Sequence, residues 1–132
     1  MSGITDLAIL LRSMTPALNA GEYRFATLPP DHPLPLAVCM ATVHEREGRS
    51  VVVSAETADT WQLDAQFPCA WITLTVHSAL HAVGLTAAVS RALAEAGIAC
   101  NVVAGNCHDH LFVPYAEAER AMHILTRLAD TA

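Results

Sequence analysis

The sequence predicts an α+β protein, because the spacing of apolar residues changes from a strand period to a helix period between Cys69 and Pro114. Ile72, Leu74 and Val76 alternate with polar neighbours, which is typical of a half-buried strand. Farther along the chain, apolar residues recur at helical spacing; they are Leu85, Ala88, Val89, Ala92, Leu93 and Ala96. Gly97 then suits the position just after a helix end, where a positive φ is common.

Two more strands and another helix complete this half of the chain. Residues 98–104 and 108–114 have the composition of strands, and Gly105-Asn106 between them predicts a turn. The last segment presents a regular apolar helix face, formed by Ala118, Ala121, Met122, Leu125 and Leu128. The predicted order is therefore β-α-β-β-α.

The N-terminal half begins with a short amphipathic helix. Its apolar residues are Ile4, Leu7, Leu10, Leu11 and Met14, and Ser2 or Thr5 is available as its N-cap. Thr15-Pro16 ends this helix, and residues 22–27 predict a strand. The stretch 28–35 contains four of the chain's seven prolines and is expected to be a loop.

A hairpin and a helix are predicted next. Residues 36–43 and 50–54 read as apolar strands, and Gly48 between them suits a turn that needs a positive φ. Residues 55–65 predict a helix capped by Ser54, with Trp61 on its inner face. Both tryptophans, Trp61 and Trp71, are expected in the core.

The two halves follow a similar order of elements, with the proline-rich loop of the first half standing where the second half has a helix. We therefore predict a divergent tandem repeat, with domains at residues 1–67 and 68–132. The alternative is a single continuous α+β sheet without an internal repeat.

Composition restricts the classes of partner. The net charge is −6, and all seven basic residues are arginines, so a nucleic-acid-binding surface is not expected. Hydrophobic residues make up 53% of a chain of 132 residues, which has a small interior to hold them. A self-complementary interface, and hence a homodimer, is expected.

The sequence also predicts a cytoplasmic protein that does not associate with membranes. No basic segment followed by an apolar core resembles a secretion signal, and the apolar segments are too short to span a bilayer. The cysteines form no CxxC pair and are expected to be reduced thiols; they are Cys39, Cys69, Cys100 and Cys107.

Several segments resemble small bacterial proteins built from two ACT-type domains. The resemblance is closest in VGLTAAVSRALAEAGIACNVVAG and HDHLFVP, and it extends to MTPALNAGEYRF and HEREGRSVVVSAETA in the first half. The C-terminal half is also similar to the ACT modules of cytosolic arginine sensors. The resemblance implies tandem ferredoxin-like βαββαβ domains with antiparallel sheets and helices on one face, which bind amino acids or other small ligands.

The turn from His77 to Thr86 is the main candidate for a ligand site. Backbone N–H groups at a helix N-terminus have no partner within the helix and attract a carboxylate. Ser78 and Thr86 offer hydroxyl contacts, and Gly84 permits a close approach to the backbone. The resemblance implies ligand binding by this loop, at His81, Ala82, Val83, Gly84 and Leu85. Alternatively, Gly84 serves only a tight turn and Thr86 only caps the helix.

Polar residues on the following strands are further candidates. Asn101 lies between apolar neighbours, and its amide can donate to and accept from a ligand, or it is simply a polar residue on the helix-free face. His108 and His110 point to one face of a strand and can donate to a ligand carboxylate. They also have the spacing of two metal ligands, with Cys107, His77 or His81 as a third, although we do not predict a metal.

No catalytic motif is present: the sequence lacks a P-loop, a nucleophile elbow and a dinucleotide fingerprint. We therefore expect a protein that is not an enzyme, needs no cofactor, and binds an amino acid or similar small ligand with a regulatory or sensing role. The alternatives are a ligand-free structural or protein-binding dimer, and a metal-binding protein that uses His108 and His110.

Overall fold

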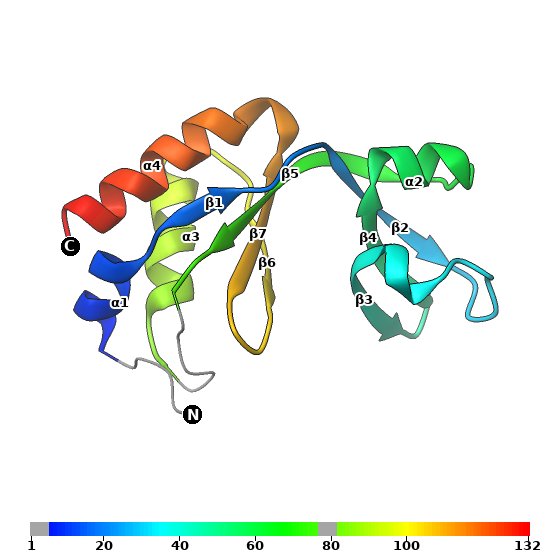
Figure 1. Ribbon diagram of the computed structural model, residues 1–132, viewed down its shortest axis with the longest axis horizontal. Coiled ribbons are helices and arrows are strands. Elements are labelled where there is room, and N and C mark those ends of the chain that lie inside the picture. Colours follow the sequence, from blue (N-terminus) through cyan, green and yellow to red (C-terminus); the bar gives the residue numbers. More distant parts are fainter. Residues whose placement is uncertain (1–5, 77–81) are drawn as a thin grey trace. The chain divides into compact units, whose positions relative to one another are not determined.

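The computed structural model describes residues 6–76 and 82–132 (Figure 1). These residues form two compact units. The larger unit contains the described residues through Asn19 together with Ala70–Ala132, and the smaller unit contains Ala20–Cys69. Strand β5, Gln66–Leu74, contributes residues to both units.

The sheet of the larger unit has the order β1-β5-β7-β6. Its strands are β1 (Pro16–Leu18), the C-terminal part of β5, β7 (Asp109–Pro114) and β6 (Asn101–Ala104). β1 pairs antiparallel to β5 with Leu18 opposite Ile72, and β6 pairs antiparallel to β7 with Asn101 opposite Phe112. Its helices are α1 (Leu7–Ser13), α3 (Leu85–Glu95) and α4 (Ala118–Asp130), the last preceded by a 3₁₀ turn at Tyr115–Glu117.

The helices of this unit cover one face of its sheet, as the resemblance implied (Figure 1). Every second residue of β5 and β7 faces them, and these strand residues are Ile72, Leu74, Leu111 and Val113. The helices contribute the buried residues Leu10, Leu11, Leu85, Val89, Leu93, Ala121, Leu125 and Ala129. Burial of these side chains, at about 1.5–3 kcal/mol for each large one, is the main stabilising term of the unit.

The first strand and the cap of the first helix differ from the sequence prediction. β1 was expected only as a helix break after Thr15, yet it pairs with β5, and the Asn19 N–H extends the pairing by donating to the Trp71 carbonyl at 2.9 Å. The N-cap of α1 is Asp6, whose carboxylate accepts from the Ile9 N–H at 3.0 Å. The predicted caps, Ser2 and Thr5, lie outside the described residues.

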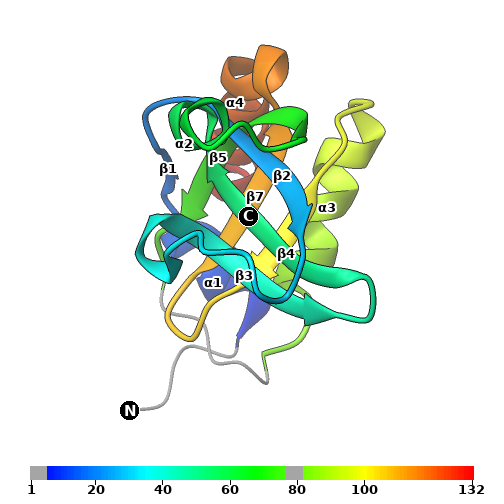
Figure 2. The same ribbon diagram turned by 90° about the vertical axis from the view of Figure 1, so that its right-hand side faces the viewer.

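The smaller unit repeats the arrangement without a helix after its first strand. Its sheet order is β3-β4-β2-β5, all antiparallel, formed by β3 (Cys39–Glu45), β4 (Gly48–Ser54), β2 (Tyr23–Leu28) and the first residues of β5. The proline-rich loop follows β2, as expected, and a 3₁₀ turn at Leu36–Val38 precedes β3 (Figure 2). Helix α2 (Ala55–Thr60) packs on β4. The core residues are Ala26, Leu28, Leu34, Val51, Val53 and Ala58.

The hairpin between β3 and β4 requires a glycine, as the sequence predicts. Gly48 has φ +146°, and a Cβ there would stand 2.5 Å from the backbone oxygen of Leu28. Any side chain would therefore push β2 and β4 apart.

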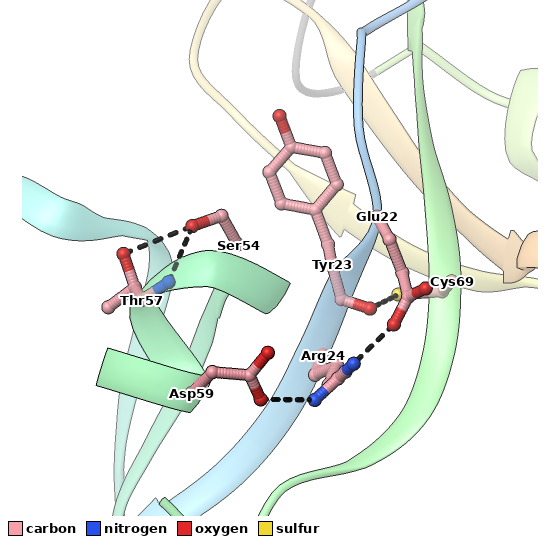
Figure 3. A network of polar contacts seen from close by, with 7 residues as sticks. All are labelled: Glu22, Tyr23, Arg24, Ser54, Thr57, Asp59 and Cys69. Carbon is pink, nitrogen blue, oxygen red and sulfur yellow. Dashed lines mark hydrogen bonds and ion pairs between the residues drawn. The ribbon is translucent and has the colours of Figure 1, made fainter. Parts of the chain in front are cut away.

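Polar contacts join α2 to β2 (Figure 3). The Arg24 guanidinium of β2 donates from Nε to Glu22 at 2.8 Å and from Nη1 to Asp59 of α2 at 3.0 Å. The Ser54 hydroxyl caps α2 by accepting from the Thr57 N–H at 3.1 Å, as predicted.

The Cys69 thiol lies in the same network (Figure 3). It is fully buried and donates to the Tyr23 carbonyl at 3.2 Å. Burial, with a smaller contribution from Glu22, raises the pKa of this thiol to about 12. The thiol therefore stays protonated and keeps its role as donor. All four cysteines are free thiols.

Helix α2 ends five residues before the predicted Ala65, because the chain turns at Gln62. The Gln62 N–H donates to the Asp59 carbonyl at 3.2 Å and the Leu63 N–H donates to the Ala58 carbonyl at 2.9 Å, a Schellman arrangement. Gln62 takes φ +53° to do so. Trp61 precedes the turn and is 38% exposed, so its predicted place on the inner helix face is wrong.

Helix α3 ends in the same way with a glycine in the turn. Gly97 has φ +74°, its N–H donates to the Ala94 carbonyl at 2.9 Å, and the Ile98 N–H donates to the Leu93 carbonyl at 2.9 Å. The strand after it is shorter than predicted, since β6 begins at Asn101 rather than at residue 98. None of the helices within 6–76 and 82–132 has the length and apolar character needed to cross a bilayer.

These two helix ends generate a matched pair of stability predictions. Replacing Gln62 by glycine is expected to raise the free energy of unfolding by roughly 0.5–1 kcal/mol, because glycine adopts a positive φ without the steric cost of a Cβ. Urea unfolding followed by circular dichroism measures the change. A lower midpoint for Gln62→Gly would contradict the assignment of strain to this turn.

The reverse change at the other helix end is expected to lower stability. A Cβ at Gly97 would meet no atom within 4 Å, so Gly97→Ala adds only the conformational cost of a positive φ. We expect a loss of about 1 kcal/mol in the same urea experiment. An unchanged midpoint would mean that the turn relaxes freely.

Candidate functional site

The predicted binding turn connects β5 to α3 in the larger unit. The structure describes its last part, Ala82–Thr86, whereas Ser78 and His81 lie outside the described residues. Among the described residues, Val83 is 82% exposed and Thr86 is exposed, while Leu85 is buried in the core and Ala82 packs against it. The side chains of Val83 and Thr86 are therefore the ones available to a ligand, and Leu85 has only its backbone to offer.

Gly84 is the N-cap residue of α3. It has φ +108°, and its carbonyl accepts from the Ala88 N–H at 2.8 Å, which starts the helix. Because it has no side chain, it supplies no capping oxygen to the first-turn N–H groups. The cap residue therefore places no side-chain acceptor at the positive end of the helix dipole.

Gly84 also lies close against the side chain of Leu7. A Cβ at this position would stand 3.0 Å from Cδ2 of Leu7 on α1. The residues beside it form an open groove of about 400 Å³, lined by Leu7, Gly84, Ala87, Ala88, Arg91, Ala92, Glu95 and Leu128. These residues belong to the helices and the helix cap, and neither Asn101 nor a histidine of β7 lines this groove.

The other predicted site residues lie on or beside the hairpin of β6 and β7. Asn101 is exposed at the start of β6, opposite Phe112. His108 is partly buried, with its Nδ1 3.3 Å from the Val76 carbonyl, so it lies next to the point where the predicted turn leaves β5. The strand was predicted to begin at His108 but begins at Asp109.

His110 has a defined tautomer. The Trp71 indole N–H donates to its Nδ1 at 3.0 Å, and the Thr73 hydroxyl lies 3.1 Å from the same nitrogen. Indole nitrogen can only donate, so Nδ1 is unprotonated and the proton of the neutral ring is on Nε2. The Asn19 side chain donates to the Thr73 hydroxyl at 3.0 Å, which leaves the hydroxyl proton for His110.

Sequence reasoning did not find the partners of His110. Trp71 was assigned to the core, yet it is only partly buried and lies on the face opposite the helices, stacked on Phe112 with the ring centroids 6.3 Å apart. The alternation of Thr73 with Ile72 and Leu74 indicated that face. No sequence signal indicated that Asn19 would reach it.

The pKa values of the neighbouring groups reflect their burial. Partial burial, reinforced by His108, lowers the pKa of His110 and outweighs the opposing effect of Asp109. Burial raises the pKa of Asp109, against the effect of both histidines. Within the described part of the chain, no group of three or more His, Cys, Asp or Glu side chains is placed to hold a metal ion. His108 and His110 therefore lack a third ligand there, and His77 and His81 lie outside it.

Comparison with known proteins identifies the fold and a close relative. Profiles of the ACT domain match residues 2–70 and 66–127. A Vibrio cholerae protein of unknown function, described as a possible transport protein, is 45% identical; the alignment covers 97% of this chain and 99% of the other, with a TM-score of 0.84. No curated protein matches the chain significantly.

More distant structures share the fold. Agrobacterium tumefaciens protein Atu0741 is 18% identical over 88% of this chain and 89% of its own, with a TM-score of 0.69. The regulatory subunit of aspartate kinase from Thermus thermophilus is 12% identical over 86% and 95%, with a TM-score of 0.58. ACT domains are regulatory rather than catalytic modules, so the profile matches support a small-ligand regulatory role. The chain belongs to the ACT domain family and carries two ACT domains in tandem.

Proposed function

We propose that this protein is a cytoplasmic sensor that binds an amino acid at the turn before α3 and passes the signal on as a homodimer. The observation that carries the proposal is the helix start at Gly84, where the cap residue supplies no side-chain oxygen. An α-carboxylate placed there accepts from the first-turn N–H groups and lies at the positive end of the helix dipole.

The remaining site residues supply selectivity in this proposal. Val83 and Thr86 contact the ligand with their exposed side chains, and Ser78 and His81, which lie outside the described residues, are further ligand contacts in this proposal. Asn101 orients the ligand from β6 through its exposed amide. His108, beside the Val76 carbonyl, and His110 donate from the hairpin. His110 has only Nε2 to donate from, because Nδ1 is engaged by Trp71.

A second candidate is a ligand-free structural or protein-binding dimer. One observation favours it: the contact of Gly84 with Leu7 and its positive φ explain the glycine without any ligand. Metal binding by His108 and His110 is less well supported, since a third ligand is missing among the described residues. Nucleic acid and membranes are not proposed as partners.

A thermal-shift screen against the twenty amino acids and a set of divalent metals separates these candidates. A ligand at about 100 times its Kd adds roughly 2.7 kcal/mol, which raises the melting temperature by about 8–10 °C for a domain of this size. One amino acid clearly above the others supports the sensor. A response to a metal alone favours the histidines, and a flat panel favours the protein-binding dimer.

Gly84→Ala and Gly97→Ala form a matched test of the turn. Both introduce a Cβ at a positive φ, one at each end of α3. Both should lower stability by about 1 kcal/mol or more. Only Gly84→Ala places its methyl group beside the first-turn N–H groups of the proposed carboxylate site, so only it should weaken ligand binding, by at least about tenfold in isothermal titration. Equal affinity for the two variants would locate the ligand elsewhere. Thr86→Ala, at an exposed position, tests whether the hydroxyl contacts the ligand and adds no backbone strain.

The lowered pKa of His110 predicts a pH dependence of stability. The unfolded chain takes up a proton on this side chain near pH 6.5, whereas the folded chain takes it up only at lower pH. The free energy of unfolding should therefore rise with pH through the range just below 6.5. The contribution of His110 is lost as the pH falls through its folded-state pKa. In His110→Asn, the amide oxygen still accepts from Trp71 but does not titrate, so the slope should flatten.

Urea unfolding between pH 5.5 and 7.5 measures this slope. His123→Asn, at an exposed position of α4, is the control for removing a histidine without disturbing the network. Identical slopes for the wild type and His110→Asn would remove His110 as the source of the pH dependence.

A further inference from the structure

The polar residues around His110 form a chain of hydrogen bonds within the larger unit. The Asn19 backbone N–H and side-chain amide both donate to the Trp71 carbonyl, at 2.9 and 3.2 Å, which holds the amide beside β5. The same amide donates to the Thr73 hydroxyl at 3.0 Å, and this hydroxyl lies 3.1 Å from Nδ1 of His110. The Trp71 indole donates to that nitrogen at 3.0 Å.

Two groups at the ends of this chain determine its direction. The Trp71 carbonyl can only accept, so the NH2 group of Asn19, and not its oxygen, faces this carbonyl and the Thr73 hydroxyl. The Trp71 indole can only donate, so Nδ1 of His110 is the unprotonated nitrogen. The Thr73 hydroxyl lies between the two, where it accepts from Asn19 and donates to His110. A proton on Nδ1 would face the indole N–H and break that hydrogen bond.

The second ring nitrogen of His110 is left for a ligand. Nε2 has no hydrogen-bond partner within residues 6–76 and 82–132. It lies beside Gly105 in the turn between β6 and β7, where a Cβ would stand 3.3 Å from Nε2. The missing side chain therefore leaves room beside this N–H. Figure 1 shows this hairpin and the first turn of α3 at the same end of the unit.

We propose that Asn19, Trp71 and Thr73 are positioning residues that hold His110 as a neutral Nε2–H donor, and that this donor recognises an uncharged oxygen in the ligand's side chain. The ligand class rests on the proposed function. A neutral ring offers no positive charge to a carboxylate, and the adjacent Asp109 repels a second anion. A cationic group meets a donor where it needs an acceptor. An amino acid with an amide or hydroxyl side chain is therefore the class that fits.

The nitrogen signals of the histidine rings test the positioning role without any ligand. In long-range 1H–15N spectra at about pH 8, where histidine is neutral, His110 should show one protonated and one unprotonated nitrogen. His32 is an internal reference for this tautomer, because its Nδ1 accepts from the Leu34 N–H at 3.1 Å. His123 is exposed on α4 and is the reference for a ring that exchanges tautomers.

Two double variants change the chain in different ways. Trp71→Phe with Thr73→Val removes both donors, and the His110 signals should move toward those of His123. Trp71→Phe with Asn19→Asp reverses the chain, because the carboxylate accepts the Thr73 proton and the Thr73 oxygen then accepts from Nδ1. Nε2 should become the unprotonated nitrogen in that variant. Wild-type His110 signals that match those of His123, or wild-type signals in both folded double variants, would overturn the positioning role.

Isothermal titration with ligands of matched shape tests the ligand class. Glutamine should bind at least about tenfold more tightly than glutamate or arginine, or threonine at least about tenfold more tightly than valine. His110→Phe should remove this preference, whereas His123→Asn should keep it. Tighter binding of a charged amino acid, or an unchanged preference in His110→Phe, would overturn the ligand class. Binding of no amino acid would overturn the proposed function and the ligand class together, while the wild-type ring spectra still decide the tautomer of His110.

Discussion

The fold depends on a single strand, β5, that both units share. The first residues of β5 pair with β2 in the smaller unit, where Tyr23 is opposite Cys69, and its last residues pair with β1 in the larger unit, where Pro16 is opposite Leu74. The two ACT profiles overlap at residues 66–70, within this strand. Cys69 and Ala70, where one unit gives way to the other, are 0% and 1% exposed. Strands of both units pair with β5, so a disruption there removes a pairing partner from each unit.

Periodicity predicted most elements because the buried positions of long segments repeat regularly. It failed where an element is short or where its partner is distant. β1 has three residues, too few to establish a period, and its partner lies more than fifty positions along the chain. The end of α2 was missed for a different reason, since the turn that ends it contains Gln62 where a glycine usually signals such a turn. Gly97 gave that signal at the end of α3, and the prediction there was correct.

The candidate site was predictable only where backbone chemistry determines it. The change to a helical period at Leu85 predicted the helix start, but the N-cap is Gly84 and not Thr86, which the sequence analysis offered as the cap. The environment of His110 could not be read from sequence, because its hydrogen-bond partners lie 39 and 37 positions away in the chain. Alternation indicates which face of a sheet a side chain occupies, but not which neighbour it meets there. The tautomer of His110, and hence the one nitrogen it can offer to a ligand, follows only from that neighbour.

Gly84 links the proposed ligand turn to the packing of α3 on α1. The N–H groups that follow it face the proposed ligand, while the space beside it holds Leu7 of α1. In the proposed function, a ligand that shifts the first turn of α3 therefore acts on the contact between α3 and α1. If self-association changes the affinity for this ligand, linkage requires that the ligand change the dimer Kd by the same factor.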